Sequence, residues 1–161
     1  MRYVSVATAT LIFGVLAGCS ARTGPTAPPS GTGMSAPAQA RLTPQNLEEL
    51  MEKIGPTYKS LLQRLEANDT AESAKQAQQL AEWFGGVEKF WAQHNRADAV
   101  KWAGQARTYA SEAAGAAATG NGEKAEAAAN NMAGACKQCH GNYREEDDAG
   151  GYRIKPGVIT P

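Results

Sequence analysis

The chain has 161 residues, which is enough for one modest domain once any processed ends are set aside. Its 16 basic and 16 acidic side chains balance each other, and the sequence has no basic stripe. Nucleic acid is therefore excluded as an expected partner.

Residues 1–18 have the features of an export signal. Arg2 is followed by an apolar stretch that is too short and too rich in small residues to predict a membrane-spanning helix. The stretch ends in Leu16-Ala17-Gly18-Cys19, which resembles the lipobox of bacterial lipoproteins, where the signal is cut before the cysteine and the thiol is lipidated. An ordinary signal peptide with an incidental cysteine is the alternative.

The expected location follows from this resemblance. Ser20 stands where lipoproteins retained at the inner membrane typically have Asp, so we expect an exported protein anchored by lipid to the outer membrane and facing the periplasm. The outer face of the cell membrane is the alternative. Residues 19–42 are rich in Pro, Gly, Ser, Thr and Ala, and they predict a disordered tether between the lipid and the domain.

Residues 43–145 predict four amphipathic helices. The first is expected to begin with Thr43 as N-cap and Pro44 as its first residue, and apolar residues then recur at three-and-four spacing. Pro56 interrupts this pattern and predicts a kink. The second helix is expected to start after Asp69 and to continue through Gly85-Gly86, because its apolar period is unbroken on both sides.

The third helix follows the turn Gln93-His94-Asn95, and the fourth runs from about Glu123 to Glu145 after Gly120-Asn121-Gly122. Four amphipathic helices with short links predict an all-α fold, an antiparallel up-down-up-down bundle. The alanine-rich faces of the last two helices would let them pack closely. Residues 146–161 form an acidic, glycine-containing tail, in which Tyr152 and Ile154 are candidates to pack on the bundle.

The fourth helix carries the chemistry-bearing motif of the chain. At 100° per residue, Cys136, Cys139 and His140 fall on one face of this helix. C-x-x-C-H is the attachment signature of c-type haem, with the histidine available to the iron. A zinc site would need a fourth ligand, and the only other histidine is His94. A redox dithiol is expected near a βαβ pattern, which the sequence lacks.

This part of the chain resembles a known family. The run Cys136-Lys137-Gln138-Cys139-His140-Gly141-Asn142-Tyr143-Arg144 is similar to the C-x-x-C-H-x-x-[FY]-R ending of the class II c-type cytochromes, and the likeness extends over about residues 43–145. The resemblance implies a four-helix bundle with one haem c. Cys136 and Cys139 would form its thioethers, and His140 would be the proximal iron ligand. It also implies that Tyr143 packs near the haem and that Arg144 balances a propionate or the proximal side.

The second axial position decides what such a haem would do. Met132 lies two turns before His140 on the same helix, about 12 Å along its axis, and cannot reach the other side of the iron. Met51 coincides with the ligand in the L-M-x-x-x-G pattern of the low-spin members. Its apolar stripe alone favours a core residue, whereas the motif match favours iron ligation. His94 is a rival ligand, although a solvated turn histidine is the simpler interpretation.

The sequence therefore predicts a membrane-anchored cytochrome that transfers single electrons to and from redox partner proteins, without catalysis of its own. A five-coordinate cytochrome c′ that binds NO or CO is the alternative. A haem-free helical interaction module is disfavoured, because it would leave the two thiols and the imidazole on one face without a purpose. The acidic cluster after residue 144 is either a solvated helix end or a docking patch for a basic partner. The family often dimerises, so a homodimer is one assembly that the resemblance allows.

Overall fold

The computed structural model describes residues 42–159. Four helices and one small two-stranded sheet make up this part of the chain, so the expectation of a helical bundle is confirmed. Cys19, the signal segment and the tether lie outside the described residues. The elements in chain order are α1 (Pro44–Glu66), α2 (Thr70–Gln93), α3 (Ala97–Ala118), α4 (Gly122–Tyr143), β1 (Arg144–Glu146) and β2 (Tyr152–Ile154).

The helices begin largely as the sequence predicts. Thr43 caps α1 reciprocally with Asn46: the Thr43 Oγ1 accepts from the Asn46 N–H at 3.2 Å, and the Asn46 Oδ1 accepts from the Thr43 N–H at 3.1 Å. Asp69 caps α2 by accepting from the Glu72 N–H at 3.2 Å. Both helices pass through the residues that break helices most often, Pro56 in α1 and Gly85-Gly86 in α2.

Three helices end in the same hydrogen-bonded turn. Asn68, Asn95 and Gly120 follow the C-caps of α1, α2 and α3 and have left-handed backbones, with φ of 55°, 55° and 74°. After α3, the Gly120 N–H donates to the Ala117 carbonyl and the Asn121 N–H donates to the Ala116 carbonyl, each at 2.9 Å. This Schellman arrangement satisfies the last carbonyls of the helix and reverses the chain within a few residues.

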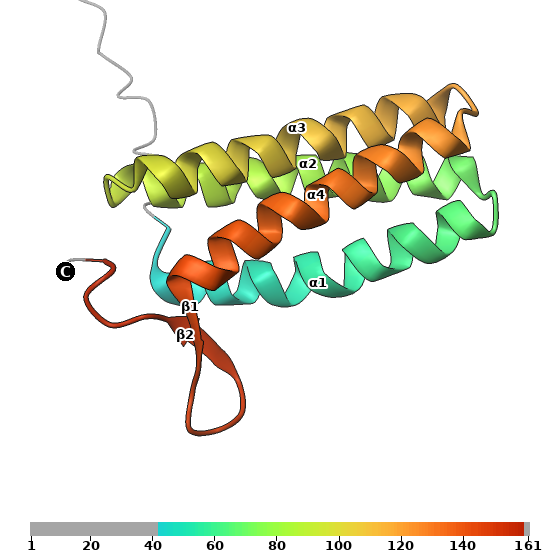
Figure 1. Ribbon diagram of the computed structural model, residues 1–161. Helices are drawn as coiled ribbons and strands as arrows, with labels where there is room; N and C mark the ends of the chain where they lie inside the picture. Colours follow the sequence, from blue (N-terminus) through green and yellow to red (C-terminus); the bar gives the residue numbers. More distant parts are fainter. Residues whose placement is uncertain (1–41, 160–161) are drawn as a thin grey trace, which may run out of the picture. The chain divides into compact units, whose positions relative to one another are not determined.

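The bundle is packed unevenly. The buried side chains of α3 are all alanines, and those of α4 are alanines with Met132, so these helices approach closely. Helix α2 packs most extensively against α3, and α3 against α4, whereas α1 and α4 contact each other sparsely (Figure 1). The large fully buried side chains come chiefly from α1 and α2, among them Leu61, Leu80 and Phe90.

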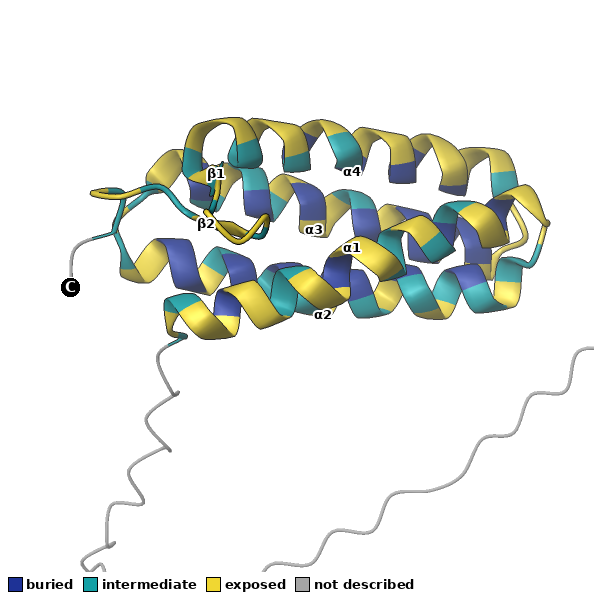
Figure 2. Cartoon of the chain, turned by 90° about the horizontal axis from the view of Figure 1, so that it is seen from below, coloured by how far each residue is buried: buried dark blue, intermediate teal, exposed yellow. Residues whose placement is uncertain are grey.

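A C-terminal hairpin lies at the end of the bundle where α1 begins and α4 ends, and it contacts both helices (Figure 2). Helix α4 ends at Tyr143 rather than Glu145, and the acidic cluster lies in the hairpin instead of on a frayed helix end. Strands β1 and β2 pair antiparallel, with Glu145 opposite Arg153, and these two side chains form an ion pair at 2.8 Å. Ile154 packs against the core as expected, while Tyr152 stays 51% exposed.

Further contacts hold the tail on the bundle. The Lys155 N–H donates to the Tyr143 carbonyl at 2.9 Å, and the Lys155 Nζ donates to the Gly141 carbonyl at 2.9 Å. Arg96, in the turn between α2 and α3, donates to the carbonyl of Val158. The chain beyond α4 is thus tied to two separate parts of the bundle. Within residues 42–159, no helix is both long and apolar enough to span a bilayer.

Candidate functional site

A cavity of about 670 Å³ opens between α1, α4 and the hairpin. Its volume lies within the range of roughly 300 to 1,000 Å³ that is usual for small-molecule and cofactor sites. The walls are mainly apolar and aromatic, and they come from four parts of the fold. The lining includes Leu47, Met51, Ile54 and Tyr58 of α1, Phe84 and Trp91 of α2, Cys136, Cys139, His140 and Tyr143 of α4, and Arg144, Asp147, Tyr152, Arg153 and Ile154 of the hairpin.

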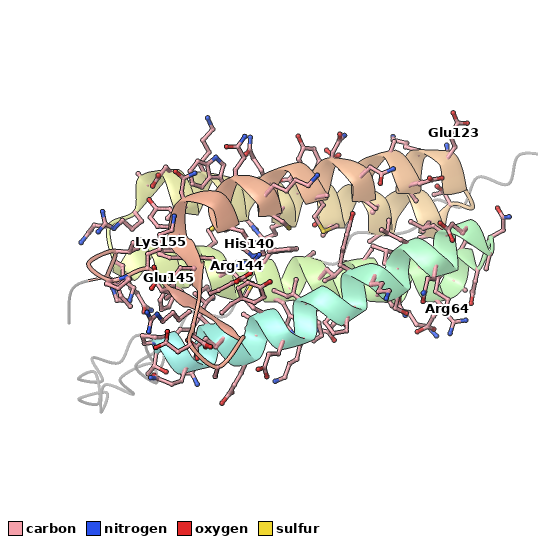
Figure 3. The ribbon with its side chains drawn as sticks, turned by 60° about the horizontal axis from the view of Figure 1, so that its bottom comes forward. Arg64, Glu123, His140, Arg144, Glu145 and Lys155 are labelled. Carbon is pink, nitrogen blue, oxygen red and sulfur yellow. The ribbon has the colours of Figure 1, made fainter. Side chains whose placement is uncertain are left out.

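All six residues predicted to contact a cofactor line this one cavity. Five of them come from the end of α4 and the first residue of β1, and the sixth comes from α1; they are Cys136, Cys139, His140, Tyr143, Arg144 and Met51. Figure 3 shows that His140 of α4 and Arg144 of β1 both lie on the side that faces α1. Sequence spacing placed five of these residues together, but only the fold brings Met51 to the same space.

The two methionines of the described bundle lie in different surroundings. Met132 is completely buried in the core and does not line the cavity, whereas Met51 is half-buried and does. His94 packs its ring against Phe90, with the ring centroids 4.6 Å apart, and it too is absent from the lining. Among the three residues weighed as a second axial ligand, Met51 alone shares the cavity with His140.

Cys136 and Cys139 are free thiols one turn apart on α4. Burial raises the pKa of Cys136 to about 11, and burial together with the neighbouring Cys136 raises the pKa of Cys139 to about 12. Both groups are therefore protonated near neutral pH. Reactive dithiols and metal-binding thiolates need the opposite environment, which lowers the thiol pKa. The described residues contain no group of three or more His, Cys, Asp and Glu side chains placed to hold a metal ion.

The surroundings of His140 favour the neutral form of its imidazole. Burial lowers its pKa first, and the nearby positive charge of Arg144 lowers it further. A neutral imidazole has a free lone pair, which is the form that binds a metal.

Tyr143 ties the end of α4 to the neighbouring helices. Its hydroxyl donates to the Asp98 Oδ1 at 2.6 Å, and its ring lies 4.8 Å from the Trp91 ring, centroid to centroid. Burial and the bond to Asp98 raise the pKa of Tyr143 to about 12, and the same bond lowers the pKa of Asp98. The residue therefore fixes the helix end on which His140 lies.

Tyr58 and Trp91 are among the aromatic residues of the cavity that the sequence did not predict as site residues. The Tyr58 hydroxyl donates to the Ala129 carbonyl at 3.2 Å and so links α1 to α4. Trp91 is only 2% exposed, and its indole N–H has no acceptor among residues 42–159. Both residues lie on apolar stripes, where periodicity does not distinguish a cavity wall from a packed core.

The chain was compared with protein-family models, with curated proteins and with solved structures, and none of them matched. The resemblance to the class II c-type cytochromes therefore stays an expectation based on the motifs.

Proposed function

We propose that this chain is a monohaem c-type cytochrome of the class II type and that it transfers single electrons. The observation that carries the proposal is that Cys136, Cys139 and His140 line a cavity to which α1 contributes Met51. The short turns between helices support the up-down-up-down arrangement, which places the start of α1 beside the end of α4.

The residues of the cavity suit a haem group. Its volume and its mainly apolar lining match a cofactor site, and the buried N–H of Trp91 lacks an acceptor that a bound group would supply. Cys136 and Cys139 would hold the group through thioethers to its vinyl carbons, and His140 and Met51 would hold the iron. The haem itself would supply the one-electron couple.

The residues of the chain would bind the haem and determine its surroundings. The thioether of Met51 would favour ferrous iron, and holding the iron through the same residues in both oxidation states would limit rearrangement during electron transfer. The apolar and aromatic walls would reduce the contact of a bound haem with water. Cys19, lipidated as its motif implies, would keep the cytochrome at the outer membrane facing the periplasm, where redox proteins exchange electrons with it.

The first test asks whether the haem is covalent. The purified full-length chain should keep its haem absorption after denaturation and extraction, whereas a variant with both Cys136→Ala and Cys139→Ala should lose it. A purified, export-matured chain that carries no covalent haem would rule out the proposed function.

A second test identifies the iron ligand by visible spectra of the ferric and ferrous protein with and without CO. We expect low-spin spectra that do not respond to CO, and we expect Met51→Ala to give a high-spin ferric form that binds CO when reduced. Met132→Ala is the matched control and should keep the wild-type spectra. High-spin iron and ready CO binding in the unmodified protein would instead support the five-coordinate, gas-binding cytochrome c′.

A further inference from the structure

We propose that the C-terminal hairpin completes the cofactor site, and that Tyr152 is a positioning residue that holds the Arg144 guanidinium for a carboxylate group of the bound haem. The inference rests on the proposed function and extends it to residues beyond the C-x-x-C-H-x-x-Tyr-Arg motif.

The hairpin forms a wall of the cavity rather than a loose tail. Asp147, Tyr152 and Ile154 belong to its lining. The turn between the strands is itself ordered by Asp147, whose Oδ1 accepts from the N–H groups of Ala149 and Gly151, each at 2.9 Å. Together with the bonds of Lys155 to the end of α4, these contacts fix the position of β2 relative to His140.

Charges at the cavity are segregated by element. Helix α1 contributes the carboxylates Glu48 and Glu52, whereas α4 and the hairpin contribute the cations Lys137, Arg144 and Arg153. A carboxylate on a bound group is repelled by the α1 edge and attracted to the α4 and hairpin edge. The acidic side chain on the hairpin side, Asp147, already accepts hydrogen bonds within its own turn.

Arg144 is the arginine at this edge that is available to a ligand. Arg153 is paired with Glu145 at 2.8 Å, whereas Arg144 has no ion pair with any carboxylate of the described residues. Instead the Arg144 guanidinium carbon lies 3.9 Å from the centroid of the Tyr152 ring. A guanidinium that lies over an aromatic ring keeps its N–H donors free at its own edges, where they can bind a carboxylate.

Tyr152 itself has no other evident role in packing. Its ring is the one large hydrophobic group of the described residues that is markedly exposed, at 51%. Its place opposite Glu146 in the ladder puts the ring on the same face of the hairpin as Arg144, because side chains alternate along a strand. The hairpin therefore presents an aromatic surface on which a cation beside the cavity rests.

The experiment measures the midpoint potential of the full-length haem protein by spectroelectrochemistry. A cation near the iron favours the reduced state, which carries less positive charge, so Arg144→Gln should lower the potential. Tyr152→Ala should lower it in the same direction, since the guanidinium then moves into solvent. Tyr152→Phe keeps the ring and should retain the wild-type potential.

Two controls make the result specific. Arg107 is an arginine of α3 that is paired with Glu88 at 2.9 Å and does not line the cavity. Arg107→Gln removes the same charge from the surface and should shift the potential less than Arg144→Gln. Amide hydrogen exchange at Lys155 reports whether the hairpin stays docked in the Tyr152→Ala variant.

The double variant Arg144→Gln/Tyr152→Ala tests whether Tyr152 acts on the potential through Arg144. We expect no shift beyond that of Arg144→Gln alone, because both changes remove one interaction. Additive shifts, no shift with Tyr152→Ala, or a Tyr152→Phe variant that behaves like Tyr152→Ala would overturn the inference and leave the cytochrome proposal intact. A chain without covalent haem would overturn both.

Discussion

Trp91 is a buried donor at the boundary between core and cavity. Its ring packs edge-on against Phe90 and more nearly parallel to Tyr143, yet its indole N–H has no acceptor within the described residues. Leaving such a group unpaired costs about 1 to 3 kcal/mol, so native proteins rarely tolerate it. Under the proposed function, the bound cofactor supplies the acceptor.

We expect Trp91→Phe to lower the free energy of unfolding of the haem-bound protein by about 1 to 3 kcal/mol beyond the loss from Trp102→Phe, because a hydrogen bond to the bound cofactor is lost. Trp102 is a fitting control since it also packs near Tyr143, with ring centroids 6.1 Å apart. Denaturant unfolding of both variants measures the difference. If the two variants lose the same stability, the indole N–H makes no bond to the cofactor.

Met132 is expected to affect the stability of the fold and not the ligation of the iron. Its side chain is completely buried between alanine-rich faces, so Met132→Ala leaves a void that nearby side chains fill poorly. We expect a loss of about 2 to 5 kcal/mol, measured by guanidinium unfolding, whereas Met132→Leu conserves volume and should cost less than about 1.5 kcal/mol. A spectral change on Met132→Ala at retained stability would contradict its assignment to the core.

At the scale of elements, the two glycines near the end of α3 make opposite demands on the backbone. Gly115 lies within the helix, and a Cβ there meets no atom within 4 Å. Gly120 follows the helix with a φ of 74°, in the left-handed conformation that closes the Schellman turn. The space around Gly120 is equally open, so only the backbone conformation distinguishes the two positions.

Replacing glycine with alanine should therefore change the free energy of unfolding in opposite directions at these two positions. Gly115→Ala should raise the free energy of unfolding by about 0.5 to 1 kcal/mol, since alanine loses less backbone entropy in a helix. Gly120→Ala should lower it by roughly 1 kcal/mol, because a Cβ disfavours the left-handed conformation. Thermal and denaturant unfolding of the two variants provide the measurement. Equal effects would show that the turn after α3 does not depend on glycine.

Helix positions were predictable from sequence because each helix carries its own signals. These signals act over a few residues: Thr43 and Asp69 mark helix starts, and the glycine-containing turn marks a helix end. The unbroken apolar period predicted that α2 runs through Gly85-Gly86. The hairpin was not predictable in this way. Its strands are three residues long, β1 is entirely charged, and its order comes from distant partners such as Arg96.

The cavity was predictable only in part for the same reason. Helical spacing alone puts Cys136, Cys139 and His140 on one face, and a family motif suggested Met51. Neither source of information indicates that Tyr152 lies beside Arg144, because that contact requires the hairpin to pair in the observed register. Trp91 was hidden by its place on an apolar stripe, where only the fold shows that its N–H lacks a partner.

At the scale of the whole molecule, the proposed anchor concerns a residue outside the described range. Cys19→Ser removes the thiol that the lipobox would lipidate. We expect this variant to appear in the soluble periplasmic fraction with its haem spectrum unchanged, whereas the unmodified chain remains with the membranes. Cell fractionation and the mass of the mature protein measure both effects. A Cys19→Ser variant that still sediments with membranes would contradict lipid anchoring at this residue.

The sparse contact between α1 and α4 has a consequence for how the chain folds. Each helix packs against its neighbour in sequence, α1 on α2, α2 on α3 and α3 on α4, and such local contacts form quickly because they close only short loops. Joining α1 to α4 closes a loop that spans nearly the whole domain, and it is this step that brings Met51 to Cys136 and His140. We therefore expect the contact between α1 and α4, and with it the cavity, to form last, so that the thiols of α4 stay open to the maturation machinery until then.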